Sequence, residues 1–155
     1  MRQSPLSRVR SAGLALAVST LAIALVVTQW PFEYRLTEFA VRAKWNRIEW
    51  SWFPRTSRGT IVNRDFVSNI LMLIPLGVGF GLWRRAAGLR VMVEGLAVGA
   101  GVAAMLELAQ LATRSRYTSF PDFWRNAAGC AVGCALAQAM LRWNWRRAQL
   151  RGTGR

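Results

Sequence analysis

The sequence of 155 residues contains no histidine, and it has only 7 acidic residues against 21 basic ones. The absence of histidine excludes a Ser-His-Asp triad, an HExxH zinc site and proton transfer by imidazole. Cys130 and Cys134 have no histidine or third cysteine with which to form a metal-binding set. We therefore expect no metal site and no cofactor. Any chemistry has to come from carboxylate, amide and guanidinium groups.

Long apolar runs occupy about half of the chain. A run of 19 uncharged residues would form a helix of about 28 Å, close to the hydrocarbon thickness of a bilayer. The predicted spans are 12–30, 66–83, 91–113 and 126–143. They predict an all-α, polytopic membrane protein with four transmembrane helices in one membrane domain over residues 1–155. A loop at 31–65 and a basic tail at 144–155 complete this organisation.

The basic residues lie mostly between the apolar runs. Arg2, Arg8 and Arg10 precede the first run without an acidic residue, whereas Glu33 and Glu38 offset the basic residues that follow it. By the positive-inside rule, both termini are expected in the cytoplasm. The net charge of +14 suits contact with anionic lipid head groups. We therefore expect membrane lipids, and no nucleic acid, as partners.

The first loop is rich in tryptophan. Ile48, Trp50 and Trp52 alternate in it like a short strand, but we favour a segment that lies on the membrane interface. The N-terminal run could also be read as a signal peptide, but its length and the poor cleavage site after it favour an anchor.

Several polar side chains lie inside the predicted spans, where an ionisable group costs about 2.5 to 3.5 kcal/mol. Glu107 shares a helix face with Gln110, about 10 Å from the end of its span. The segments DFVSN and DFWRN open the second and fourth spans. Because these spans begin on the side where the third one ends, we expect one polar layer. Its ligand-binding residues would be Asp65, Asn69, Gln110, Arg116 and Asn126, with Glu107 and Asp122 as the acid–base pair of an enzyme.

Simpler roles are open for some of these residues. Asp65 and Asp122 could cap helices, and Arg116 could neutralise Glu107. Glu94, close in sequence to Arg84 and Arg90, is predicted to form a local ion pair away from this layer. The repeated D-F-x-x-N pattern also suggests two tandem helical hairpins related by an axis along the membrane normal.

Small residues recur at a spacing of four within the spans. Gly129 and Gly133 form a GxxxG pair, and Gly77 opens another, so we predict close helix packing there.

The ordered set of motifs resembles the VanZ-like family of small bacterial membrane proteins over about residues 65–135. It comprises Asp65, Asn69, Pro75, Gly77, Glu107, Gln110, Arg116, Asp122, Asn126, Gly129 and Gly133. The resemblance implies a helical protein of the bacterial inner membrane. The family takes its name from a member associated with resistance to the glycopeptide teicoplanin, and the resemblance raises that relation for this chain.

Three classes of function follow. The first is a site that binds, and in an enzyme would modify, a lipid-linked precursor of the cell envelope. The second is a proton-coupled transporter, working as a homodimer, in which Glu107 carries the proton and Pro75 breaks its helix. The third is an accessory subunit whose glycine faces pack against a partner membrane protein.

Overall fold

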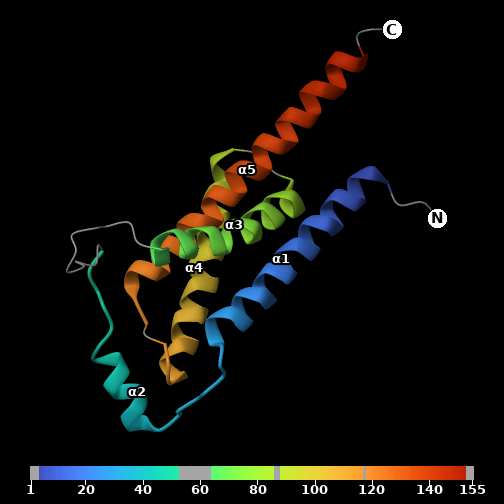
Figure 1. The fold of residues 1–155 in the computed structure, drawn as a ribbon. Coiled ribbons are helices and arrows are strands. Elements are labelled where there is room, and N and C mark those ends of the chain that lie inside the picture. The colour runs from blue at the N-terminus through green and yellow to red at the C-terminus, as the bar shows by residue number, and fades with distance from the viewer. Residues whose placement is uncertain (1–3, 53–63, 86–87, 117, 153–155) are drawn as a thin grey trace.

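The computed structural model describes residues 4–52, 64–85, 88–116 and 118–152, and all regular secondary structure in them is helical (Figure 1). The helices are α1 (Pro5–Gln29), α2 (Glu38–Trp45), α3 (Arg64–Arg84), α4 (Leu89–Ala112) and α5 (Phe120–Gly152). Pairing between extended segments in these residues is limited to two isolated β-bridges. The prediction of an all-α protein is confirmed.

In the part of the chain that the structure describes, three helices are long and apolar enough to cross a membrane, over Leu6–Gln29, Val67–Arg84 and Leu89–Ala112. They coincide with the first three predicted spans to within a few residues, except that α1 begins earlier. The fourth predicted span, 126–143, lies within α5, which is not among the three. Asn126, Gln138 and Arg142 lower the mean hydropathy of this segment, so the expected count of four spans is not reached on composition.

The four long helices form a row in the order α1, α3, α5, α4, because α3 packs against both α1 and α5, and α4 packs mainly against α5. Gly13 of α1 lies beside Gly79 of α3, and Gly99 of α4 lies beside Cys130 of α5. Within each of these pairs the two helices run antiparallel. The chain therefore forms two helical hairpins side by side, with the start of α1 and the end of α5 at the same end of the molecule (Figure 1).

The two central helices, α3 and α5, run parallel and touch through their backbones. A Cβ atom on Gly77 would overlap the carbonyl of Cys130, and one on Gly129 or Gly133 would overlap the carbonyl of Ile70 or Ile74. The three predicted packing glycines thus lie at one crossing, where the absence of a side chain permits this approach.

Pro75 lies inside α3, and the helix continues through it to Arg84. The break in the helix that the transporter hypothesis places at Pro75 is therefore not present. A proline ring removes one backbone hydrogen bond and crowds the preceding turn, and here the remaining bonds keep the helix continuous.

The first loop contains a helix, α2, that the sequence analysis did not predict. Thr37 caps its start by accepting a hydrogen bond from the N–H of Ala40 at 3.4 Å, Glu38 lies in its first turn, and Arg42 and Lys44 lie in its last.

The rest of the loop is attached to the ends of α4 and α5. Tyr34 pairs with Thr113, and Glu49 pairs with Ser119, each in a single β-bridge. The alternation at Ile48, Trp50 and Trp52 therefore corresponds to one bridge at Glu49 and not to a strand. These contacts hold the aromatic residues of the loop against the junction between α4 and α5.

Candidate functional site

A cavity of about 470 Å³ lies where α1 and α4 end and α3 and α5 begin. Each of the four long helices contributes side chains to its wall, and so does the loop after α4. The predicted site residues that line it are Asn69, Glu107, Gln110, Arg116, Asp122 and Asn126. The remaining one, Asp65, has its side chain outside the part of the chain that the structure describes. The helix directions that predicted a polar layer thus bring these residues to one cavity.

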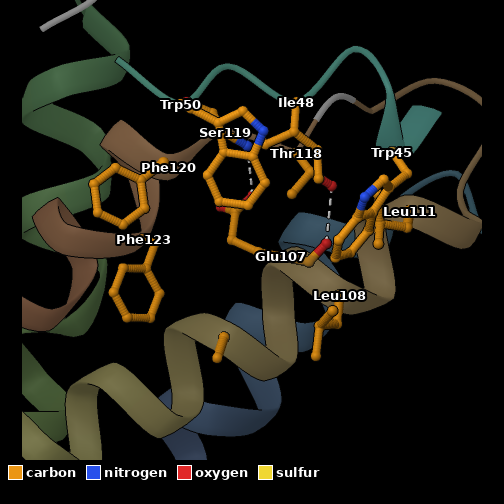
Figure 2. Close-up of a pocket in the computed structure, with 11 residues that line it drawn as sticks. Trp45, Ile48, Trp50, Glu107, Leu108, Leu111, Thr118, Ser119, Phe120 and Phe123 are labelled. Carbon is orange, nitrogen blue, oxygen red and sulfur yellow. Dashed lines mark hydrogen bonds between the residues drawn. The ribbon is translucent and has the colours of Figure 1, made fainter. Parts of the chain in front are cut away.

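Glu107 is 6% exposed and is held by the segment that leads into α5. Its Oε2 accepts a hydrogen bond of 2.9 Å from the backbone N–H of Ser119. The hydroxyl of Thr118 donates to the backbone carbonyl of Glu107 at 3.0 Å (Figure 2). These bonds fix the carboxylate at the cavity wall.

The sequence left open that Arg116 neutralises Glu107, but the structure shows no such ion pair among the described residues. Its guanidinium donates instead to the carbonyl of Val27, at the end of α1, at 3.3 Å. Among the described residues no ion pair is formed by Glu107. Arg116 therefore lines the cavity as a cation whose charge is not matched by that carboxylate.

Asp122 takes its counter-charge from its own helix. The guanidinium of Arg125, which is 2% exposed, donates to Oδ1 of Asp122 at 2.9 Å. Sequence reasoning missed Arg125, although its i,i+3 spacing from Asp122 on a helix was a usable signal. The two carboxylates of the cavity thus lie in different surroundings, with Asp122 paired to a cation and Glu107 bonded to a backbone amide.

Asn126 carries a buried acceptor that has no donor. The residue is 3% exposed, and its Oδ1 has no hydrogen-bond partner within the described part of the chain. Gln138, further along α5, is also buried, but its amide bonds to both the N–H and the carbonyl of Gly88, at 2.7 and 3.2 Å. Because a buried acceptor without a donor destabilises a fold, its presence at a cavity indicates a place for a ligand donor.

Several residues of the cavity wall were not expected. Thr28, near the end of α1, is buried, and its hydroxyl donates to the carbonyl of Ala24 at 2.8 Å. Ser68 and Ser115 add two further hydroxyl groups, and Val27 and Met72 add apolar surface. Thr28 could have been found, because the first span ends on the same side as the third.

Lys44 supports the site from outside, which the sequence did not indicate. Its ammonium donates to the carbonyls of Gln110 at 3.1 Å, of Arg116 at 2.6 Å and of Thr113. These carbonyls lie at the end of α4 and in the loop after it, so one side chain ties that loop to α2. Partial burial lowers the pKa of Lys44, because removal from water disfavours the charged ammonium.

The opposite end of α4 holds the predicted local ion pair. Glu94 accepts from Arg84 at 2.9 Å and from Arg90 at 3.1 Å, outside the cavity. Cys130 and Cys134 are buried against glycines of α4. Within the described ranges no group of three histidine, cysteine or acidic side chains could hold a metal ion.

The profile of one protein family, described as VanZ/LLP1, matches residues 9–142. This match is wider than the motif region at 65–135, and it takes in α1 and the first loop. No curated protein and no solved structure matches the chain. The apolar helices, the ordered polar motifs and a profile match over most of the sequence together place this chain in the VanZ/LLP1 family.

Proposed function

We propose that this protein binds the polar head group of an envelope lipid, or of a lipid-linked glycan precursor, in the cavity at the shared end of the four long helices. The observation that carries the proposal is the buried Asn126, whose Oδ1 has no hydrogen-bond donor among the described residues. It lies in a cavity lined by Asn69, Gln110 and two carboxylates. Sugars and peptides carry many hydroxyl and amide groups that pair with such side chains.

The charges of the cavity suit an anionic head group that also carries donors. Arg116 can pair with a phosphate or carboxylate in two parallel hydrogen bonds. The starts of α3 and α5 border the cavity, and the positive ends of their dipoles favour anions. Glu107 would accept from a hydroxyl or an ammonium group of the same ligand, so the two sides of the cavity would recognise different parts of one head group.

The proposal includes α5 as a fourth crossing, over about residues 126–143. Since α3 and α4 cover much of α5, small and polar residues on it do not all face lipid. Four crossings place both termini on one side of the inner membrane, and the basic N-terminus favours the cytoplasm. The cavity then opens on the outer side.

A fusion experiment tests this topology. Alkaline phosphatase is expected to be active when fused after Trp52 and inactive when fused after Arg155. Activity at both positions would exclude a fourth crossing.

Native mass spectrometry tests the ligand. The protein would be extracted in mild detergent from its own membranes, as wild type, Glu107→Gln and Asp122→Asn. A lipid-linked envelope compound is expected on the wild type and lost from both variants. Glu94→Gln is the matched control, since it removes a carboxylate from the other end of α4 and should keep the ligand. Absence of such a compound from all four folded proteins would reject the proposal in favour of transport or a packing role.

A further inference from the structure

A second, smaller pocket lies beside the cavity, on the other side of Glu107. It has a volume of about 200 Å³. Aromatic rings of the first loop and of the start of α5 form its outer wall, and α4 forms its floor (Figure 2). We call it the aromatic groove, and its main lining residues are Trp45, Trp50, Leu108, Leu111, Phe120 and Phe123.

The groove presents carbon atoms to whatever enters it. Its polar members are Glu107, Thr118 and Ser119, and they bond to one another through the Thr118 hydroxyl and the Ser119 N–H. These bonds pair the Thr118 hydroxyl, the Ser119 N–H and one carboxylate oxygen of Glu107. Most of the surface left for a ligand is the faces of the rings and the leucine side chains. Such a lining selects hydrocarbon.

The groove opens on the side of the molecule that faces lipid. Leu108, on a helix apolar enough to span a membrane, is 58% exposed, and Trp50 is 62% exposed. Tryptophan prefers the boundary between head groups and hydrocarbon, so the groove lies near that depth. A hydrocarbon chain can therefore enter from the bilayer without crossing water.

Glu107 borders both the aromatic groove and the polar cavity. We infer that the groove binds the hydrocarbon chain of the same lipid whose head group occupies the cavity, with the junction of head and chain at Glu107. This inference rests on the function proposed above and adds that the ligand is an amphiphile recognised at both ends. The volume is sufficient for the first part of a chain, because an apolar cavity of about 150 Å³ holds a benzene molecule.

Binding of a series of monoalkyl amphiphiles tests the inference. The full chain in amphipol would be titrated with hexanoyl and oleoyl lysophosphatidate, with a polyprenyl phosphate beside them to distinguish an acyl from an isoprenoid source. A dibromostearoyl analogue reports contact, because bromine quenches the fluorescence of nearby indoles. We expect the oleoyl compound to bind at least tenfold more tightly than the hexanoyl one.

Two alanines of α4 give a matched pair of variants. Ala104 lines the groove, and Ala104→Phe would fill it, whereas Ala97 is exposed on the same helix outside the groove. Ala104→Phe should reduce oleoyl affinity to the hexanoyl level and leave hexanoyl binding unchanged, which also shows that the variant is folded. Ala97→Phe should behave as wild type.

Head-group binding is tested separately. Arg116 lines the cavity, whereas Arg114 does not. Arg116→Met should therefore weaken the binding of both lysophosphatidates at least tenfold, and Arg114→Met should not.

The outcomes separate the two proposals. If Arg116→Met leaves hexanoyl binding unchanged, the head-group site is wrong. If hexanoyl binding depends on Arg116 but chain length and Ala104→Phe have no effect, only the groove is rejected. If oleoyl binding depends on Ala104 and not on Arg116, the groove takes hydrocarbon alone and the shared ligand is rejected.

Discussion

The carboxylate of Glu107 on α4 accepts a hydrogen bond of 2.9 Å from the backbone N–H of Ser119, which lies one residue before α5. This bond joins two segments that both line the aromatic groove, and Glu107 also lines the polar cavity. The carboxylate therefore has a fixed position between an apolar and a polar compartment, and the donor that fixes it is a main-chain group.

Because the donor is a main-chain group, only a proline at position 119 should remove it. Ser119→Pro is expected to release the Glu107 carboxylate and weaken binding of the co-purified compound about tenfold, which corresponds to about 1.4 kcal/mol. Ser119→Ala keeps the N–H and should bind as wild type. Native mass spectrometry with added compound measures both. Equal binding by the two folded variants would show that this hydrogen bond does not position Glu107.

Two buried amides of α5 should respond oppositely when replaced by alanine. Asn126→Ala removes an acceptor that has no donor, so the protein should be as stable as wild type or more stable, while ligand binding falls. Gln138→Ala leaves the backbone of Gly88 without its partners and should destabilise the protein by about 1 to 3 kcal/mol, with ligand binding retained.

Thermal unfolding in detergent and native mass spectrometry together check this pair. A clear loss of stability in Asn126→Ala would mean that the amide serves the fold and not a ligand.

The crossing of α3 and α5 should not tolerate a methyl group. In Gly133→Ala the new Cβ would overlap backbone atoms of Ile74 and Gly77, which cannot move aside without shifting the helix. We expect a loss of about 1 to 3 kcal/mol. Gly101→Ala is the control, since nothing lies within 4 Å of a Cβ there. Within a helix that change should stabilise by about 0.5 to 1 kcal/mol. Unfolding in dodecyl sulfate measures the stability of both variants. A Gly133→Ala variant as stable as wild type would contradict the close packing of α3 and α5.

Lys44 does not line the cavity, but its replacement should disturb the loop that does. Lys44→Met removes the donor for three carbonyls at the end of α4, including that of Arg116, so the loop that carries Arg116 loses its attachment. We expect stability to fall by about 1 to 3 kcal/mol and ligand binding to fall with it. Arg47→Met changes an exposed cation of the same loop and should leave both properties unchanged. Identical behaviour of the two variants, measured by thermal unfolding and native mass spectrometry, would argue against this role.

Most of the residues that line the cavity could be predicted from the sequence, because their position depends only on the direction of each helix. Glu107, Asn69 and Asn126 follow from apolar runs that begin or end on one side of a membrane, and such runs are visible without any contact being known. The helix α2 could also have been predicted, because Thr37, Glu38 and the basic last turn are typical of a short helix. Only the tryptophan-rich segment after it was considered.

Other parts of the site depend on contacts between distant segments. Lys44 meets the carbonyl of Arg116 across the first loop, and Ser119 meets Glu107 across the turn into α5. Backbone donors and acceptors carry no signature in the residue type, so neither bond could be predicted. The partner of Asp122, Arg125, was within reach of sequence reasoning, because the two residues are three apart at the start of a predicted helix.

The backbone contact between α3 and α5 bears on how the protein is made. In the proposed topology α5 emerges last from the ribosome, and it is the long helix least able to enter lipid by its own hydropathy. Its glycines meet carbonyls of α3, so the surface that receives α5 has already been synthesised. Insertion of the final segment should therefore depend on the earlier helices staying near the translocon. A truncated chain that lacks α3 should fail to integrate α5, although the α5 sequence is intact.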